Sequence, residues 1–592
     1  MFSQNVTLSQ FPAPLQLFPR DDQDSAAVPV KGWVLVPGYD SAFVRVLKNN
    51  QPYKRESMPL VYGGTSASFS FAPKIHAELS EYSFELYVKN ASGSTLVARR
   101  DSIVCGDVFL INGQSNSWPR RSQANYRNEF CRSFGRSTGY NPYNPADTLW
   151  GLARANGSLW FHTGAWGIKL QQLIKETYGV PVCIINGGSG GSSIEYNLPD
   201  NTNRMNLNTT YGRLLYRATK AGVADHVKAI FWHQGESNTN STWVNYKSNF
   251  KKLFQAWRQD YPSIQKRYVF QIRPGCGGAN QSELREVQRN FYSANIEIMS
   301  TTAIPGHDGC HYTAAGYFRM AEQLFRQIAR DFYGSTDTVN INPPDIATAY
   351  YTTSSQDEIV LEFSRTDSLL WPGDYKGHRM VDYFYLDGAW GEVISGRTEG
   401  NKVILKLAGS SSATKITYLP GRTYNNSTAV YEGPWITNPR GIGVLSFYEF
   451  PIALPPAGPP ELLQPAGDAR DLAVNVHFTW RPVDRATSYH IQVAESPFFT
   501  SLVIDVPLLQ TTEYKTGVLL NDHRYYWRVR AVNSVTASDW SETRSFTTII
   551  AAPEAPLLIA PNNNAAHLPP DVTLQWDSSS RAETYHIQVA KD

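Results

Sequence analysis

Residues 108–117 read VFLINGQSNS, and this stretch passes from four apolar residues directly into a polar turn. Short apolar runs of this kind are typical of buried strands, and an Asn-Gly pair marks a tight turn. Ser115 is therefore expected just past the end of a core strand. A serine in this position is either a turn residue or a nucleophile, and the surrounding sequence decides between the two.

The segment around this strand alternates between strand-like and helical patterns. Further apolar runs follow at 180–186, 227–233, 268–272 and 296–300. Between them, apolar residues recur at helical spacing in three groups: Trp166, Leu170, Leu173 and Ile174; Phe250, Leu253, Phe254 and Trp257; and Phe318, Ala321, Leu324, Phe325, Ile328 and Phe332. This alternation predicts a parallel sheet covered by helices on both faces, in which sites lie at the carboxyl ends of the strands.

Four polar motifs interrupt this segment, three directly after predicted strands and the fourth between the last strand and a helix. They are NGQSN (112–116), NGGSGGSSIE (186–195), HQGESN (233–238) and GHDGCH (306–311). Because the carboxyl ends of parallel strands meet at one edge of a sheet, we expect the four motifs to converge there. That convergence is a stronger signal than any single motif.

These motifs contain the groups that nucleophilic hydrolysis requires. Such a reaction needs a hydroxyl, a base that takes its proton, a carboxylate that orients the base, and donors for the oxyanion. Ser115 is the candidate nucleophile, and His311 is the candidate base. Asp308 lies three residues before His311, on a turn leading into a helix, a spacing that suits a carboxylate facing the imidazole Nδ1. Backbone N–H groups at Ser115 and in the glycine run, with the amide of Gln234, are candidate oxyanion donors.

Together the motifs resemble those of the SGNH (GDSL-like) hydrolases, in the carbohydrate-esterase branch that includes sialate O-acetylesterases and plant-type acetylxylan esterases. That branch carries G-Q-S-N, G-G-[ST]-x-I, H-Q-G-E and D-x-x-H, and this chain has them in that order at 113–116, 190–194, 233–236 and 308–311. The resemblance covers residues 105–334 well and the flanking β regions more loosely. It implies a flavodoxin-like three-layer α/β/α domain flanked by β-sandwich domains.

The resemblance also implies roles for single residues. Ser115 is then the nucleophile, His311 the base and Asp308 the carboxylate that orients it. The backbone of Gly190 and the side chain of Gln234 join the Ser115 N–H in the oxyanion hole. The resemblance implies no metal and no cofactor.

Four neighbouring residues are weaker candidates. By the same match Asn116 and Glu236 support the site, Glu236 as a buried organiser and not as an acid catalyst. The residues after Asn116 are Ser-Trp, where many relatives have Met directly after the Asn. Arg120 and Arg121 follow, and they either meet an anionic substrate such as a sialate carboxylate or are two solvated surface arginines.

Another serine competes with Ser115 as the nucleophile. GGSGG at 187–191 matches the G-x-S-x-G elbow of α/β-hydrolases, which makes Ser189 the rival. That fold usually takes its acid and base from separate loops, whereas Asp308 and His311 share one. The glycine run is also typical of a flexible loop near a ligand.

The remaining alternatives concern acids and histidines. His307, Asp308 and His311 have a spacing compatible with metal ligands, but no H-E-x-x-H motif and no clear third ligand accompany them. Glu236 with Asp308 as a glycosidase acid pair leaves the serine and glycine motifs unexplained. His233 ends a predicted strand and is interpreted as a structural histidine.

The regions outside the central segment are β-rich. Residues 1–104 and 335–455 show short alternating runs, which are typical of β-sandwiches. PPAGPP at 455–460 is a stiff linker. We therefore predict an N-terminal β-sandwich at 1–104, a hydrolase domain at 105–334 and a further β domain at 335–455.

An internal repeat follows the linker. Trp480 and Trp576, and then YHIQVA at 489–494 and 585–590, recur with an offset of 96 residues. A Trp on an early strand of a unit this long is typical of an immunoglobulin-like sandwich. The predicted domains are a fibronectin type III-like repeat at 456–549 and a partial second repeat at 553–592, with the aromatic residues in core positions. Because the second copy stops about halfway, we expect the natural chain to continue.

Composition argues against several other classes of protein. The 592 residues carry a net charge of +2 without a block of like charges, so the sequence shows no basic cluster of the kind that binds nucleic acid. No stretch reaches the roughly 18 to 20 consecutive apolar residues of a membrane span. Five cysteines without a C-x-x-C pair argue against a zinc ribbon and leave one or two disulfides open. We interpret the N-terminus as a mature start and expect a secreted, periplasmic or cell-surface protein.

The sequence therefore predicts a multidomain serine esterase that removes O-acetyl groups from a carbohydrate through an acetyl-enzyme intermediate. Sialate, xylan and other O-acetylated glycans all fit the motifs as substrates. One alternative is a metal-dependent hydrolase, which sensitivity to a chelator would reveal. From another class, the chain is a glycan-binding protein with an inactive hydrolase domain.

Overall fold

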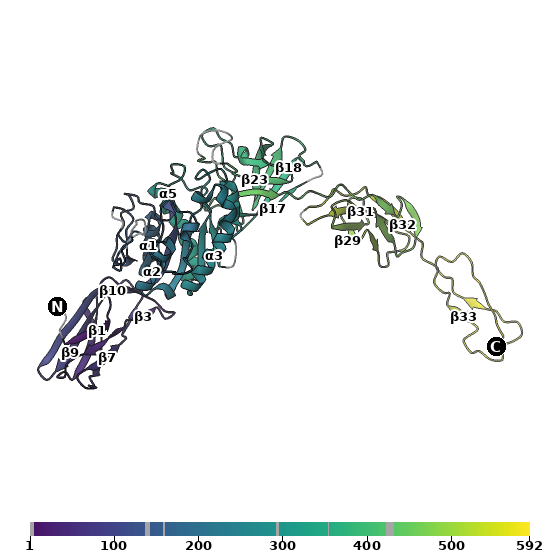
Figure 1. The fold of residues 1–592 in the computed structure, drawn as a ribbon. Helices are drawn as coiled ribbons and strands as arrows, with labels where there is room; N and C mark the ends of the chain where they lie inside the picture. Colours follow the sequence, from purple (N-terminus) through teal and green to yellow (C-terminus); the bar gives the residue numbers. More distant parts are fainter. Residues whose placement is uncertain are drawn as a thin grey trace. The chain divides into compact units, whose positions relative to one another are not determined.

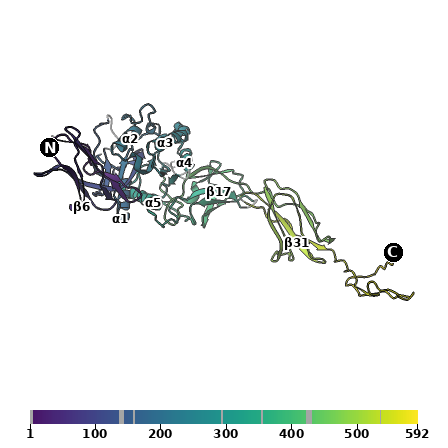
Figure 2. The same cartoon turned by 90° about the horizontal axis from the view of Figure 1, so that it is seen from below.

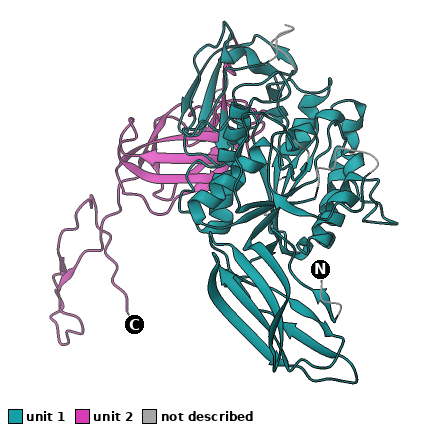
Figure 3. Cartoon of the chain, turned by 90° about the vertical axis from the view of Figure 1, so that its left-hand side faces the viewer, with its two compact units in different colours: residues 1–349, 361–408, 413–451 teal, residues 350–360, 409–412, 452–592 magenta. Residues whose placement is uncertain are grey.

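The computed structural model describes residues 5–135, 143–157, 160–291, 295–352, 355–421, 431–534 and 536–591. The chain divides into two compact units (Figure 3). Unit 1 consists of residues 1–349, 361–408 and 413–451, and unit 2 consists of residues 350–360, 409–412 and 452–592.

Unit 1 begins with a set of strands that contribute to one apolar core. They are β1 (Val6–Gln10), β2 (Leu17–Pro19), β3 (Ser25–Ala27), β4 (Val30–Val34), β5 (Ser41–Lys48), β6 (Gln51–Pro59), β7 (Ala67–Phe71), β8 (Lys74–His76), β9 (Tyr82–Asn90) and β10 (Gly93–Gly113). One sheet has the order β1-β4-β7, and β5 pairs with β6 and β9 in another. Every second residue of β4 and β7 is buried, as the sequence alternation predicts, and both sheets contribute to the same core.

Strand β10 belongs to two sheets at once. Its first half pairs antiparallel with β9, from Gly93 to Ile103. From Asp107 onward it pairs in parallel with β13 (Val182–Asn186) on one side, and from Val108 with β14 (Val227–His233) on the other. The predicted domain boundary after residue 104 therefore falls inside one continuous strand.

The central sheet has the order β12-β11-β13-β10-β14-β15-β16. Its remaining strands are β11 (Cys131–Phe134), β12 (Trp150–Leu152), β15 (Lys266–Phe270) and β16 (Ile296–Met299). All neighbours pair in parallel except β12, which runs antiparallel to β11 at the edge. The carboxyl ends of β10, β13 and β14 therefore meet at one edge of the sheet.

In the described residues five α-helices cover the central sheet, and Figure 2 shows α1 and α5 on the side opposite to α2, α3 and α4. They are α1 (Ala165–Tyr178), α2 (Thr210–Lys220), α3 (Tyr246–Asp260), α4 (Gln281–Arg289) and α5 (Ala314–Tyr333). Val108 and Leu110 of β10 share a core with α2, α3 and α4, whereas Phe109 and Ile111 share one with α1 and α5. Strand runs that are apolar on both faces are thus explained by helices on both faces.

A second β-rich region follows α5. Its strands are β17 (Asp345–Tyr351), β18 (Glu358–Ser364), β19 (Phe384–Leu386), β20 (Ala389–Trp390), β21 (Val393–Glu399), β22 (Lys402–Leu407), β23 (Lys415–Tyr418) and β24 (Phe447–Pro451). Strands β19, β20, β23 and β24 form one sheet in the order β20-β19-β23-β24.

Unit 2 contains the fibronectin type III-like sandwich that the sequence predicts. Its strands are β25 (Leu462–Gln464), β26 (Ala469–Leu472), β27 (His477–Trp480), β28 (Ser488–Ala494), β29 (Leu502–Leu509), β30 (Glu513–Lys515), β31 (Arg524–Val532) and β32 (Arg544–Thr548), drawn in green in Figure 1. They form sheets with the orders β25-β27-β30 and β26-β32-β31-β28-β29. Trp480 and Tyr489 lie in the shared core, as predicted.

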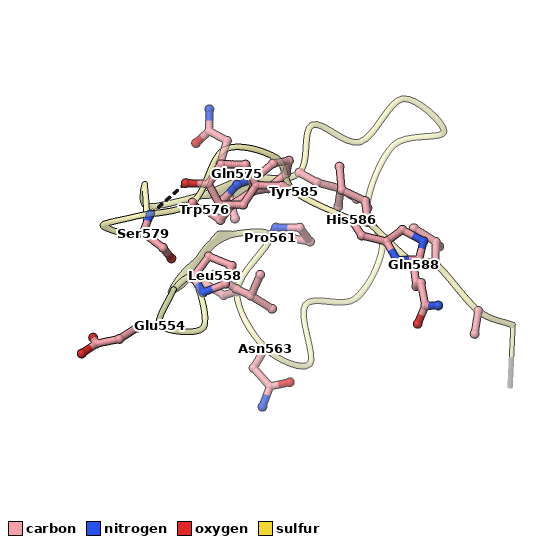
Figure 4. Close-up of a pocket in the computed structure, with 18 of the residues that line it drawn as sticks. Glu554, Leu558, Pro561, Asn563, Gln575, Trp576, Ser579, Tyr585, His586 and Gln588 are labelled. Carbon is pink, nitrogen blue, oxygen red and sulfur yellow. Dashed lines mark hydrogen bonds between the residues drawn. The ribbon is translucent and has the colours of Figure 1, made fainter. Parts of the chain in front are cut away.

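The second copy of the repeat differs from this prediction. Its described strands are β33 (Leu558–Ala560) and β34 (Gln575–Trp576), which pair as a two-stranded sheet. Tyr585 is 38% exposed, whereas its counterpart Tyr489 is 6% exposed. Trp576 and Tyr585 therefore line an open cavity of about 840 Å³ (Figure 4) instead of a closed core, because no second sheet packs on them among the described residues.

The cavity in Figure 4 contains none of the residues that the sequence singles out for chemistry. Within the described parts of the chain, no helix is long and apolar enough to cross a membrane.

Candidate active site

Ser115 lies at the carboxyl end of β10, where the strand passes into a short 3₁₀ helix, η1 (Ser115–Ser117). The turn depends on Gly113, whose φ is 138°, because a Cβ at this position would lie 2.1 Å from the carbonyl oxygen of His233 in β14. The Ser117 hydroxyl donates to the Gln114 carbonyl oxygen at 2.6 Å and closes the turn. Ser115 is left half-buried at the sheet edge, while the residues around it are buried.

His311 contacts Ser115 although 196 positions separate them in the chain. The imidazole Nε2 lies 2.9 Å from the Ser115 Oγ, which is hydrogen-bond distance. The imidazole Nδ1 lies 3.7 Å from the Asp308 Oδ2, which is an ion-pair separation and too long for a direct hydrogen bond. The structure thus brings the predicted nucleophile, base and carboxylate together in one row.

Asp308 is held by the backbone of its own loop. Its Oδ1 accepts hydrogen bonds from the N–H groups of Cys310 at 2.9 Å and His311 at 2.7 Å. Burial acts to raise the pKa of Asp308, but these donors, with the facing imidazole, outweigh it and hold the pKa below its ordinary value. The carboxylate therefore stays ionised beside His311 at neutral pH.

Several contacts fix the loop that carries Asp308 and His311. A disulfide joins Cys310 to Cys276, and Arg273 donates to the Gly309 carbonyl oxygen at 3.2 Å. On the helix side, the Thr313 hydroxyl caps α5 by accepting from the Gly316 N–H. These contacts hold the loop at Gly309, at Cys310 and at the start of α5.

We expect loss of the Cys276–Cys310 disulfide to lower both stability and activity. The bridge closes a loop across a sequence separation of 34, so its removal should cost about 3 to 4 kcal/mol of unfolding free energy. Activity should fall by about tenfold, since small misplacements of catalytic groups are costly. Thermal unfolding and acetate release of the Cys276→Ser/Cys310→Ser variant check this, with Cys105→Ala, which removes a buried free thiol, as control. An unchanged rate in the double variant would show that the other anchors suffice.

Asn116 and Glu236 form a buried support directly beneath Ser115. The Asn116 Nδ2 donates to Glu236 Oε1 at 2.8 Å and to the Cys310 carbonyl oxygen at 3.1 Å, and its Oδ1 accepts from the Tyr317 hydroxyl at 2.6 Å. Asn116 therefore links the strand end, the loop and α5. Among the described residues, no hydrogen bond joins Glu236 to Ser115 or His311.

Glu236 and His233 form a buried pair. The His233 Nε2 lies 3.5 Å from Glu236 Oε1, and the imidazole stacks on Phe270 at a centroid distance of 4.8 Å. Burial acts to raise the pKa of Glu236, but its contacts with His233 and Asn116 outweigh burial and lower it. His233 is fully buried.

Of the three predicted oxyanion donors, two are backbone groups with suitable surroundings. Ser115 is the first residue of η1, so its N–H has no partner within that helix. Gly190 is exposed beside Trp118, and a Cβ there would lie 3.7 Å from the indole. Within the described residues, no hydrogen bond uses the Gly190 N–H.

Gln234 has different surroundings from those that the oxyanion role requires. It is fully buried, and its Nε2 lies 2.7 Å from Asn238 Oδ1 and 3.2 Å from both the Gln114 Oε1 and the Ser192 carbonyl oxygen. An amide has two N–H groups, and these acceptors occupy them. In this structure the Gln234 amide connects three of the motifs through its contacts with Gln114, Ser192 and Asn238, and it presents no free donor to Ser115.

The side chains of the two candidate arginines contact different parts of the chain. Arg120 donates to the Gly157 carbonyl oxygen and is exposed. Arg121 donates through Nε to the Tyr312 carbonyl oxygen at 2.7 Å. Arg121, but not Arg120, lines a cavity of about 530 Å³ together with His311 and Asp308.

The competing assignments find less support in the geometry. The Ser189 N–H donates to the Gly113 carbonyl oxygen at 3.0 Å, and no contact between its hydroxyl and an imidazole occurs among the described residues. The His307 Nε2 contacts the Arg273 guanidinium, and burial together with this cation lowers the pKa of His307 to about 4. Where the structure describes the chain, it groups no three His, Cys, Asp or Glu side chains that could hold a metal ion.

Sequence reasoning missed Arg273 and the cysteine pairing. Arg273 is buried and also donates to the carbonyl oxygens of its neighbour Pro274 and of Tyr431, so it connects the loop to the segment around Tyr431. Its position directly after the predicted strand YVFQI was a usable signal. The pairing of Cys276 with Cys310 had none, because five cysteines permit many connections.

Parts of the chain are similar to a known protein family and to solved structures. Residues 105–330 match the family described as carbohydrate esterase, sialic acid-specific acetylesterase. The chain is similar to the structure of a carbohydrate acetylesterase from Xanthomonas citri, with 20% identity, coverage of 75% of this chain and 99% of that chain, and a TM-score of 0.50, a likeness of fold.

Two further solved structures cover smaller parts. A protein from Arabidopsis thaliana has 18% identity and covers 38% of this chain and 99% of that chain, with a TM-score of 0.32. A Fn3-like protein from Clostridium thermocellum has 16% identity and covers 16% of this chain and 94% of that chain, with a TM-score of 0.13. No curated protein matches the chain significantly.

Proposed function

Residues 105–330 are a domain of the carbohydrate esterase family of sialic acid-specific acetylesterases, and from this premise we propose that the chain removes O-acetyl groups from a carbohydrate with Ser115 as nucleophile. The observation that carries the proposal is the 2.9 Å contact between the Ser115 Oγ and the His311 Nε2. A serine hydroxyl is a weak nucleophile until a base at this distance takes its proton.

The reaction follows from the positions of these groups. The Ser115 Oγ attacks the acetyl carbonyl carbon as His311 takes the hydroxyl proton, and the negative charge moves to the carbonyl oxygen. The N–H groups of Ser115 and Gly190 stabilise that oxyanion. The bond to the sugar oxygen then breaks, and His311 returns the proton to it, which leaves acetyl-Ser115. Water, deprotonated by His311, attacks the acetyl group and releases acetate with a regenerated serine.

Asp308 orients the base in this proposal. Its carboxylate faces the His311 Nδ1 at 3.7 Å and favours the imidazolium that forms during both steps. The lowered pKa of Asp308 keeps the charge in place as the pH falls toward the ordinary range of an aspartate.

The sugar that carries the acetyl group is the finer part of the proposal. We propose a sialate-type acidic sugar, supported by the family description and by Arg121, a cation in the cavity that His311 lines. An O-acetylated plant or microbial polysaccharide such as acetylxylan is the second candidate, supported by the multidomain construction with a fibronectin type III-like module.

The fold class and compartment belong to the same proposal. Without the edge strands β11 and β12, the sheet order β13-β10-β14-β15-β16 corresponds to second, first, third, fourth and fifth along the chain, the flavodoxin-like order. We further propose that the protein works outside the cytoplasm, because the Cys276–Cys310 disulfide suits an oxidising environment.

Labelling of the nucleophile tests the proposal. Diisopropyl fluorophosphate should phosphorylate the Ser115 Oγ with release of fluoride and abolish acetate release from 4-nitrophenyl acetate, since only an activated serine reacts readily. Peptide mapping by mass spectrometry locates the adduct. An adduct on Ser189, or full activity without any adduct, would contradict the assignment.

A further inference from the structure

A second cavity, of about 550 Å³, borders the loop that carries His311. It shares His307 with the cavity beside His311 and Asp308. Its other walls come from residues 303–306 and from two segments of the β-rich region after α5, 372–376 and 432–437. The volume is within the range of small-molecule binding sites, and none of these wall segments takes part in the reaction described above.

Two aromatic side chains, Tyr375 and Trp435, form part of the wall. Tyr375 is 40% exposed, and Trp435 is partly buried. The indole of Trp435 packs edge-on against Tyr431 at 4.4 Å, and its Nε1 donates to the Glu432 carbonyl oxygen at 3.1 Å. Gly433 lies between the two rings, where a Cβ would be 3.1 Å from the Trp435 Nε1 and 3.6 Å from the Tyr375 ring. The indole of Trp435 is therefore held in place by Tyr431 and Glu432, and the Tyr375 ring is accessible at the cavity.

The charges in the wall are nearly balanced. Lys376 forms an ion pair with Glu432, and Asp374 adds a second carboxylate. The ion pair raises the pKa of Lys376 and lowers that of Glu432, so both stay charged at neutral pH. His307 is neutral there, since its pKa is about 4. The wall thus has no excess positive charge that would attract an anionic sugar.

We propose that this cavity binds a neutral sugar unit of the same glycan whose acetyl group is presented to Ser115, so that the substrate is an oligosaccharide or polysaccharide chain. The inference rests on the proposed esterase function and names its substrate more closely. A pyranose ring has an apolar face that packs on aromatic rings and hydroxyl groups that donate to carboxylates, and the wall offers Tyr375, Trp435, Asp374 and Glu432 for these contacts. Because His307 borders both cavities, one chain can reach from this cavity to His311.

Chain-length dependence tests the inference. The probes are chemically O-acetylated xylose and xylotetraose, and 9-O-acetyl sialic acid with its sialyllactose counterpart, with 4-nitrophenyl acetate as the small ester. The wild type should have a kcat/KM about tenfold higher for the longer member of at least one pair, because tenfold is the size of effect that one well-placed contact has on binding. Tyr375→Ala should remove that difference. Both proteins should hydrolyse 4-nitrophenyl acetate equally.

Matched variants separate a binding role from a structural one. Trp390→Ala removes another half-exposed aromatic residue of the same β-rich region that does not line the cavity, and it should leave all rates unchanged. Trp435→Phe should weaken the chain-length advantage while keeping the ring. Equal rates within both pairs, hydrolysis of the small ester without any glycan, or a parallel loss on the small ester would overturn the inference. Absence of any hydrolysis by the wild type would instead refute the esterase proposal.

Discussion

Acetate release is expected to fall by about 10⁴-fold or more when Ser115 is replaced by alanine, because the acetyl-enzyme cannot form without the hydroxyl. The side chain packs little, since Ser115 is half-buried on a turn that depends on Gly113 and Ser117. Ser115→Ala should therefore fold normally, with an unchanged thermal unfolding curve. Initial rates with 4-nitrophenyl acetate and with an O-acetylated glycan measure the loss.

Ser189→Ala is the matched control for this variant. Ser189 lies on the neighbouring glycine-rich turn and is also partly buried, but its described hydrogen bonds are made by its backbone. Its replacement should leave kcat within about twofold of the wild type. If Ser115→Ala kept the wild-type rate while Ser189→Ala lost it, the nucleophile would be Ser189.

Replacement of His311 by glutamine should lower kcat by about 10³- to 10⁴-fold, because the Ser115 proton then has no acceptor of suitable basicity. In the Ser115→Ala/His311→Gln double variant the losses should not add, since both residues serve the same step. Single-turnover kinetics with 4-nitrophenyl acetate measure the acylation step directly. A double variant with a much lower rate than either single variant would show that the two residues act independently.

Replacement of Asp308 should lower kcat less than replacement of His311. Its carboxylate is 65% exposed and 3.7 Å from the imidazole, so solvent screens the interaction. Asp308→Asn should therefore cost only about tenfold to 100-fold in kcat. A loss as large as that of His311→Gln would mean that the loop closes more tightly around substrate than it does here.

Local patterns predicted five strands of the central sheet, the helices α1, α3 and α5, and the convergence of the motifs, but not α2, α4, β11 or β12. Apolar runs at 108–111 and 227–233 predicted parallel core strands, and the structure has them as β10 and β14. The spacing of Asp308 and His311 predicted a carboxylate facing the imidazole of the same loop, because three residues on a tight turn leave little conformational choice. Distances of this kind depend on local chain geometry and can be inferred from sequence.

The expectation for Gln234 shows where such inference ends. The H-Q-G-E match indicated a donor, whereas the folded chain surrounds the amide with acceptors from three other segments. The second repeat is another example: Tyr585 has the same local sequence as Tyr489 but a different burial, because burial depends on which sheet packs against it. Neither outcome is encoded within a few residues.

The sequence by itself predicted which side chains meet at the sheet edge, since the order of strands and the residues directly after them place Ser115, Asp308 and His311 there. Only the tertiary structure decided how that set is held. It pairs Cys276 with Cys310, places Arg273 against the His311 loop and brings residues 372–376 and 432–437 to the same loop as a second cavity. These contacts join segments far apart in the chain, and their formation depends on the packing of whole layers, which no short motif specifies.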